Sequence, residues 1–280
     1  MRIALLSNRD LHGNIGVNLL RDALAGHEVS LFLSDKVGGA KPLPAAIPEL
    51  EMLHVLEQDL PVNVLWPLAN AAGRNPEARY GTFEQIAAEL GGSCESLPQP
   101  NTPESLERLR RFAPDLVVSV RYGRVLRDDF LRIPLLGVLN LHSGRLPSYR
   151  GILATLHALV AGDKALGPTL HWIQDGTIDT GAVIGIGEVP VQPGRSLLDH
   201  ILSVYPPGID LLKDALHRLS RGETLRSTSQ DPNDGRYFGF PGADDFRALA
   251  EKGFPLYDPA GYVRLLRNWV PLPSRESSPE

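Results

Sequence analysis

Residues 137–151 read GVLNLHSGRLPSYRG, and this stretch decides the fold that we expect. Its apolar first part, residues 138–141, is typical of a short buried strand. Side chains alternate between the two faces of a strand, so Asn140 and His142 are expected to point to the same side. The glycines and the proline of residues 144–151 predict a shaped loop after the strand. An amide and an imidazole therefore lie side by side at a strand end, which indicates a functional site.

The beginning of the chain predicts an α/β protein. Residues 3–6 are apolar, residues 7–16 form a polar stretch with two glycines, and helical spacing of apolar residues starts at Val17. A strand, a loop and a helix in this order open a doubly wound fold with a mostly parallel sheet. Further strands are predicted at residues 29–33, 115–120, 167–173 and 182–189. Further helices are predicted at residues 82–90, 103–112, 151–160, 243–251 and 260–269, and from residue 196 with a second piece at 209–219.

Residues 36–80 are the least regular part of the sequence. Six prolines interrupt short apolar stretches there. Proline lacks a backbone donor and is disfavoured inside helices, so we expect no long helix in this region. A strand or two within irregular connections is predicted, and no chemistry is assigned to it.

The composition excludes several classes of protein. The 280 residues carry a formal net charge of −5 and one cysteine, Cys94. Nucleic-acid binding relies on clustered Lys and Arg and is not expected, and a lone cysteine fits a reducing compartment. No apolar run approaches the roughly 20 residues of a membrane span, and the first residues turn polar too early for a signal peptide. We therefore expect a cytoplasmic protein without a membrane or nucleic-acid partner, of undetermined oligomeric state.

Asp179, in the connection between two predicted strands, completes the candidate site. Asn140, His142 and Asp179 combine a neutral donor, a group that titrates near neutrality and a carboxylate. Such a set stabilises an oxyanion and moves a proton. No serine or cysteine stands in an activated-nucleophile motif, which favours direct attack by a bound amine over covalent catalysis. A metal site formed by His142, His171 and Asp179 is the alternative.

The loop of residues 8–16 is a second candidate site. It lacks the third glycine of a dinucleotide-binding motif, but its amides at a helix N-terminus suit an anionic substrate group. Asn8, Asp10 and Asn14 are therefore candidate substrate-binding residues, and a plain strand-to-helix turn is the alternative. Arg145 is a further candidate, with a solvated loop residue as the alternative reading.

Several spaced motifs resemble the folate-dependent formyltransferase family, which includes glycinamide ribonucleotide and methionyl-tRNA formyltransferases. The resemblance covers about residues 115–205. The matching segments are Tyr122-Gly123-Arg124-Val125-Leu126, Asn140-Leu141-His142, Leu146-Pro147, Tyr149-Arg150-Gly151, Thr169-Leu170-His171 and Asp179-Thr180-Gly181.

The resemblance implies transfer of a formyl group from 10-formyltetrahydrofolate to a nitrogen nucleophile. It implies that Asn140 and protonated His142 bind the oxyanion and that Asp179 keeps His142 cationic and relays a proton. The residues that it implies for the folate pocket are Arg124, Val125, Leu126, Ile173, Asp175 and Ile178. No metal is implied.

The resemblance also leads to expectations about the domain bounds and about the molecule that accepts the formyl group. We expect a formyltransferase-like catalytic domain at residues 1–220, a short C-terminal extension at 221–270 and a disordered tail at 271–280. The residues after 205 are not basic, so a tRNA substrate is not expected. A small amine is expected, with hydroxyornithine in siderophore biosynthesis ahead of an amino sugar carried on a nucleotide. A non-catalytic folate-binding protein is the alternative of another class.

Overall fold

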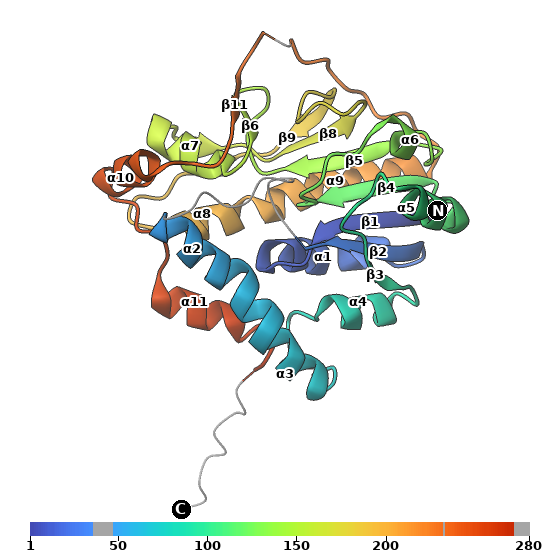
Figure 1. Cartoon of the computed structure of the whole chain (residues 1–280), viewed down its shortest axis with the longest axis horizontal. Coiled ribbons are helices and arrows are strands. Elements are labelled where there is room, and N and C mark those ends of the chain that lie inside the picture. The colour runs from blue at the N-terminus through green and yellow to red at the C-terminus, as the bar shows by residue number, and fades with distance from the viewer. Residues whose placement is uncertain (36–46, 232, 272–280) are drawn as a thin grey trace, which may run out of the picture.

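A seven-stranded sheet forms the centre of the molecule, with helices on both faces (Figure 1). The computed structural model describes residues 1–35, 47–231 and 233–271. The strand order is β3-β2-β1-β4-β5-β8-β9. The first five strands of this order are parallel, and β8 and β9 each run antiparallel to the strand before them. This arrangement confirms the predicted doubly wound, mostly parallel α/β fold.

The strands of the sheet are β1 (Arg2–Asn8), β2 (Glu28–Ser34), β3 (Cys94–Ser96), β4 (Leu116–Val120), β5 (Val138–His142), β8 (Thr169–Ile173) and β9 (Val183–Ile186). Two small pairs join β6 (Tyr149–Gly151) to β11 (Arg236–Phe238) and β7 (Ala165–Leu166) to β10 (Val189–Pro190). The helices are α1 (Leu11–Leu24), α2 (Pro48–His54), η1 (Val55–Asp59), η2 (Pro61–Leu65), α3 (Trp66–Ala71), α4 (Phe83–Glu89), α5 (Pro103–Phe112), α6 (Asp128–Leu131), α7 (Ala154–Ala161), α8 (Leu197–Ser203), α9 (Tyr205–Ser220), α10 (Ala243–Glu251) and α11 (Pro259–Leu266).

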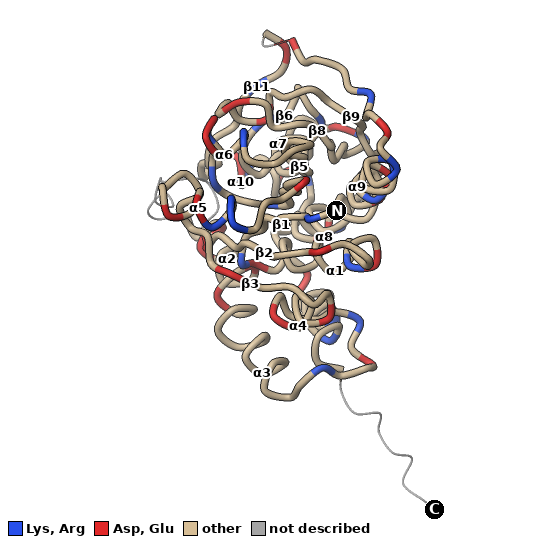
Figure 2. The backbone as a smooth tube through the Cα atoms, turned by 90° about the vertical axis from the view of Figure 1, so that its right-hand side faces the viewer, with Lys and Arg blue, Asp and Glu red and all other residues tan. Residues whose placement is uncertain are grey.

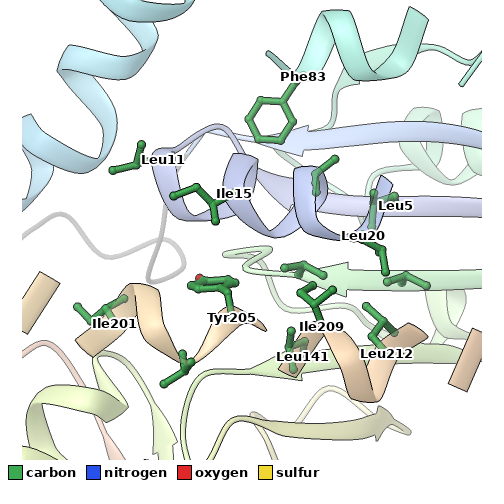
Figure 3. Close-up of a cluster of buried hydrophobic side chains, with 14 of the residues drawn as sticks. Leu5, Leu11, Ile15, Leu20, Phe83, Leu141, Ile201, Tyr205, Ile209 and Leu212 are labelled. Atoms are coloured by element: carbon green, nitrogen blue, oxygen red, sulfur yellow. The ribbon is translucent and has the colours of Figure 1, made fainter. Parts of the chain in front are cut away.

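Strand β1 shows why the sheet is covered on both faces. Ile3 and Leu5 belong to a large apolar cluster with helices α1 and α9, whereas Ala4 and Leu6 belong to a second cluster with α5. Successive strand residues point to opposite faces, so a continuous apolar run serves both layers. Figure 3 shows part of the larger cluster, with Leu5 of β1, Leu20 of α1, and Ile209 and Leu212 of α9.

Residues 48–71 correct the expectation that prolines exclude a long helix. Four consecutive segments, α2, η1, η2 and α3, form one uninterrupted helical run. Pro48 stands at the first position of the run, where the missing N–H costs least, and Pro61 lies inside it, at the start of the second π-type segment. The Leu60 N–H bonds to the Val55 carbonyl and the Trp66 N–H to the Pro61 carbonyl, both π-type bonds. These wider turns accommodate the prolines without breaking the helix.

The C-terminal residues pack onto the rest of the chain at three places. The Trp269 indole donates to Asn14 Oδ1 (2.9 Å), and the Tyr262 hydroxyl donates to the Leu56 carbonyl (2.6 Å). Helix α11 therefore lies beside the helical run of residues 48–71 (Figure 1). Strand β11 pairs in parallel with β6. The proposed division at residue 220 thus separates sequence segments that share one core; residues 272–280 of the predicted tail lie outside the described residues.

The carboxyl ends of the parallel strands position the candidate site. Neighbouring β1 and β4 lead into helices on opposite faces of the sheet, and such a switch point is where doubly wound folds bind ligands. Asp10 follows β1, and Arg121 follows β4 directly. Among the described residues, no helix is both long and apolar enough to cross a bilayer.

Candidate active site

A cavity of about 710 Å³ opens at the carboxyl ends of β4 and β5. Its size lies in the usual range of small-molecule sites. The cavity wall includes all three predicted catalytic residues and all six predicted folate-pocket residues: Asn140, His142, Asp179, Arg124, Val125, Leu126, Ile173, Asp175 and Ile178. Strand β5 brings Asn140 and His142, and the connection between β8 and β9 brings Asp179.

The Asp179 carboxylate lies between two imidazoles. Its Oδ2 is 3.5 Å from His142 Nδ1, and its Oδ1 is 3.5 Å from His171 Nε2. Antiparallel pairing of β5 and β8 places His171 directly opposite Asn140, which explains why His171 reaches the same carboxylate. The two predicted segments therefore meet at Asp179.

Asn140 is oriented by its neighbours. The Ser119 hydroxyl donates to Asn140 Oδ1 (2.8 Å), so the Asn140 amide nitrogen faces His171 Nε2 (3.0 Å) as a donor. His171 Nδ1 faces the Trp172 carbonyl (2.9 Å) and carries the proton of the neutral ring. This tautomer and amide orientation follow from the hydrogen-bond network. Asn140 keeps its second N–H for a ligand.

His142 has a hydrogen-bond acceptor at each ring nitrogen. Its Nδ1 faces Asp179, and its Nε2 lies 2.7 Å from the Tyr149 carbonyl oxygen. Both contacts suit an imidazolium, which donates from both nitrogens. The ring is buried with an edge on the cavity wall, so it is placed to exchange a proton with a bound molecule.

The backbone at Asp179 adopts a left-handed conformation, with φ of 56°. For a residue other than glycine such a conformation costs on the order of 1–3 kcal/mol and persists where the surroundings enforce it. The Gly151 N–H donates to Asp179 Oδ2 (2.9 Å) and is one such constraint. The strained backbone thus aims the carboxylate at the two imidazoles.

The surroundings of Asp179 keep it ionised. Burial alone raises the pKa of the Asp179 carboxyl, but the charge of His142 and the hydrogen bond from the Gly151 N–H oppose this, so that the pKa lies below its ordinary value. Charged partners and donors favour the ionised form of a carboxyl. Asp179 is therefore a carboxylate at neutral pH, as a proton-accepting or imidazolium-stabilising group requires.

The predicted folate-pocket residues form one side of the cavity. Val125 and Ile178 are partly exposed apolar side chains, and Leu126 is buried. Arg124 pairs with Asp35 (3.2 Å). Asp175 accepts hydrogen bonds from the backbone and side chain of Thr177, which shapes the connection before Asp179. Apolar walls with a few polar groups are typical of pockets for flat ring systems.

The structure corrects the candidate roles of Asn8 and Asn14. Both side chains have no exposed surface and do not line the cavity. Asn8 donates to Asp10 (2.8 Å) and accepts from Ser34, and Asn14 accepts from Asn18 and Trp269. Asn8 and the Asn14 amide oxygen thus hold the loop and the C-terminal segment, and neither side chain reaches the cavity wall.

Asp10 and Arg145 also differ from their candidate roles. Asp10 lines the cavity, but its carboxylate is the N-cap of α1, accepting from the Gly13 N–H, and it also accepts from Arg121 Nε (2.9 Å). Arg145 does not line the cavity and pairs with Glu188 (3.7 Å). Asp10 is thus held by Arg121 and by the start of α1, and Arg145 is a partly solvated loop residue.

A buried ion cluster on the cavity wall was not predicted. Arg121 contacts Asp10 and Glu57, with Nη2 2.8 Å from Glu57 Oε2. His12 Nδ1 lies 3.7 Å from the same oxygen. Burial raises the pKa of Glu57 to about 7, although Arg121 opposes this, and burial lowers the pKa of His12 well below its ordinary value. Arg121 follows a strand end, which was a usable signal, whereas nothing in the local sequence marked Glu57.

Glu57→Gln is expected to change how stability depends on pH. The pKa of Glu57 is raised from 4.5 to about 7, so the stability that its protonated form contributes is present below pH 4.5 and lost as pH rises through 7. The free energy of unfolding of wild type relative to Glu57→Gln should therefore fall between pH 4.5 and 8. Urea unfolding of both proteins at several pH values measures this difference. The histidines contribute equally to the free energy of unfolding of both proteins, so their titration does not affect the difference.

The control for this comparison is Glu107→Gln, since Glu107 lies exposed on α5. Its stability difference from wild type should be nearly independent of pH. A Glu57→Gln difference that stays constant, or that rises, between pH 4.5 and 8 contradicts the assigned environment of Glu57.

The alternative of a metal site at His142, His171 and Asp179 gains no support from other ligands among the described residues. Within residues 1–35, 47–231 and 233–271, no three or more His, Cys, Asp or Glu side chains are arranged to hold a metal ion. Although His142, His171 and Asp179 meet, the ring nitrogens of His171 already face Asn140 and the Trp172 carbonyl.

Comparison with known proteins places this site in a family. Residues 77–202 match the model of the formyl transferase family. Methionyl-tRNA formyltransferase from Salinispora tropica is 34% identical over 190 residues, which cover 68% of this chain and 60% of that protein. The chain thus spans about 60% of the length of the curated relatives that it matches.

Solved structures share the fold. Glycinamide ribonucleotide transformylase 1 from Symbiobacterium toebii aligns with a TM-score of 0.56 and 19% identity, over 82% of this chain and 94% of that one. An N-formyltransferase from Helicobacter canadensis, in complex with folinic acid and dTDP-3-aminofucose, aligns with a TM-score of 0.55 and 17% identity, over 85% and 71%. The match that spans Asn140, His142 and Asp179 places residues 77–202 in the formyl transferase family.

Proposed function

We propose that the protein is an N-formyltransferase that moves a formyl group from 10-formyltetrahydrofolate to the nitrogen of a small amine. The observation that carries this proposal is the meeting of Asn140, His142 and Asp179 on the wall of one cavity. Their chemistry matches what the attack of an amine on a formyl carbon requires: a donor for the oxygen and acceptors for the proton.

Each of the three residues has a distinct part in the proposed reaction. The free N–H of Asn140 stabilises negative charge on the formyl oxygen. The Asp179 carboxylate, ionised at neutral pH, holds the imidazolium of His142, accepts the proton released by the amine, and returns it to the departing tetrahydrofolate nitrogen. His142 Nε2 faces the Tyr149 carbonyl and reaches a bound formyl oxygen only by exchanging that partner.

The cavity fits a folate donor, which supplies the activated formyl group. Val125, Leu126 and Ile173 give it an apolar wall, and the 173–178 segment offers backbone groups beside Asp175. The cavity volume of about 710 Å³ accommodates a ring system together with a small acceptor.

For the acceptor we propose hydroxyornithine, which links the protein to siderophore biosynthesis. The cavity wall carries five carboxyl groups, from Asp10, Asp35, Glu57, Asp175 and Asp179, and two guanidinium groups, from Arg121 and Arg124. This balance favours a cationic or zwitterionic molecule over a polyanion. Acidic and basic residues are interspersed along the backbone in Figure 2, whereas tRNA binding relies on clustered basic residues.

A nucleotide-linked amino sugar is the second candidate acceptor. Its support is the similarity to the Helicobacter canadensis N-formyltransferase in complex with dTDP-3-aminofucose. The excess of carboxyl groups in the cavity speaks against a diphosphate, and a local rearrangement around Arg121 would be needed to bind one.

An acceptor panel tests the proposed function. The purified protein is incubated with 10-formyltetrahydrofolate and, separately, with hydroxyornithine, a dTDP-linked amino sugar, glycinamide ribonucleotide or methionyl-tRNA, and the formylated product is identified by mass spectrometry. Formylated hydroxyornithine as the preferred product is expected. If the sugar nucleotide or the tRNA is preferred, the proposed acceptor is wrong but the proposed formyl transfer stands. Folate binding without formylation of any amine would make the protein a non-catalytic folate binder.

A further inference from the structure

Gln230 holds the backbone on both sides of the turn that carries Asp179. Its amide nitrogen donates to the Asp179 carbonyl (3.0 Å) and to the Gly181 carbonyl (2.6 Å). Two carbonyl acceptors fix the orientation of the amide, because its oxygen would be repelled by both. The amide oxygen is buried and has no hydrogen-bond partner among the described residues, so the side chain is used for these two contacts alone.

The turn held by Gln230 is under strain. Asp179 has a left-handed backbone, with a φ of 56°. A conformation of this kind relaxes unless neighbouring groups enforce it. The Gly151 N–H fixes the carboxylate end of Asp179, and Gln230 fixes its backbone end.

The segment that carries Gln230 is anchored before and after it. Thr228 exchanges two backbone hydrogen bonds with Val183 on β9, each 2.8 Å long. Strand β11 then pairs with β6, whose Tyr149 carbonyl faces His142 and whose Gly151 N–H faces Asp179. The same segment therefore contacts the Asp179 backbone and pairs with the strand whose backbone groups face His142 and Asp179.

We infer that Gln230 is a positioning residue, which holds Asp179 at the distance from His142 that proton transfer needs. The inference rests on the proposed role of Asp179. It goes beyond the family match, because Gln230 and β11 follow the matched residues 77–202. Gln230 acts on the reaction through the Asp179 backbone and does not line the cavity.

Gln230→Glu tests the inference with little change in side-chain volume. The carboxylate cannot donate and faces two carbonyl oxygens, so the turn should shift. We expect kcat for formyl transfer to fall by about 10²-fold, the effect of a misplacement near 1 Å, with KM for 10-formyltetrahydrofolate unchanged. Gln230→Ala, which removes the donor without adding charge, should lower kcat in the same direction. Gln99→Glu is the control, since Gln99 is exposed and follows β3 at the opposite edge of the sheet.

A second readout is independent of turnover. The ring N–H signals of His142, assigned by nitrogen-15 NMR with a His142→Gln reference, report its contact with Asp179. They should move or broaden in both Gln230 variants and stay unchanged in Gln99→Glu. Folded variants with wild-type kcat and wild-type His142 signals overturn the inference. If wild type formylates no amine, the proposed function fails, and the His142 signals alone decide whether Gln230 positions Asp179. Should Gln230→Glu fail to fold, Gln230→Ala decides by the same two measurements.

Discussion

Asp179→Asn is expected to lower kcat for formyl transfer by about 10²- to 10⁴-fold, the usual contribution of a positioned acid–base group. The substitution removes the negative charge between His142 and His171 but keeps the shape of the side chain. Asparagine tolerates the left-handed backbone that Asp179 adopts, so the variant should fold. Affinity for the donor should change little, because the folate-pocket side chains are untouched.

The Asp179→Asn measurement combines steady-state kinetics with binding of 5-formyltetrahydrofolate, a stable analogue of the donor. Asp210→Asn is the matched control, since Asp210 is exposed on α9, where it pairs with Lys213. Wild-type kcat in Asp179→Asn would show that the carboxylate has no part in the reaction. Lost analogue binding with lost activity would indicate a structural role instead.

Asn140→Ala is expected to lower kcat by about 10²- to 10³-fold, the typical effect of removing one oxyanion donor. Asn140 offers one N–H to His171 and keeps the other for the formyl oxygen. The loss should appear in kcat and in kcat/KM alike, because the contact strengthens as charge develops on the oxygen. The Ser119 hydroxyl would lose its hydrogen-bond acceptor, and this loss would account for part of any decrease in the free energy of unfolding.

Asn63→Ala is the control for this variant, because Asn63 is exposed on the helical run of residues 48–71. Kinetics and the free energy of unfolding are measured on both variants. A fall in Asn140→Ala confined to KM would contradict oxyanion stabilisation and would place Asn140 in ground-state binding.

The sequence predicted the sheet and the meeting of the three residues for identifiable reasons. Apolar runs such as residues 116–120 are buried on both faces of the sheet, and a short continuous apolar run of this kind is typical of a parallel sheet covered by helices. Alternation along β5 put Asn140 and His142 on one side, as the structure shows. The pairing of β5 with β8, which adds His171 to the site, is a long-range contact that no local pattern encodes.

Other features depended on contacts that local patterns do not report. The prolines of residues 48–71 disfavour an ordinary α-helix, but π-type turns absorb them, and this helix brings Glu57 to Arg121. The polar loop after β1 made Asn8 and Asn14 candidate substrate-binding residues, whereas both are buried as partners of other polar groups. A polar residue beside a strand end thus has two uses, and only tertiary structure distinguishes them.

The most direct test of a formyl transfer centre at Asn140, His142 and Asp179 is a crystal structure of the protein soaked with 5-formyltetrahydrofolate. The measured quantity is the distance from the formyl group to Asn140 Nδ2 and to the nearest His142 ring nitrogen. We predict that the pteridine lies against Val125, Leu126 and Ile173, with the formyl group within about 4 Å of both nitrogens, close to hydrogen-bonding reach. An analogue bound elsewhere, or bound in the cavity with its formyl group turned away from both side chains, would contradict the account.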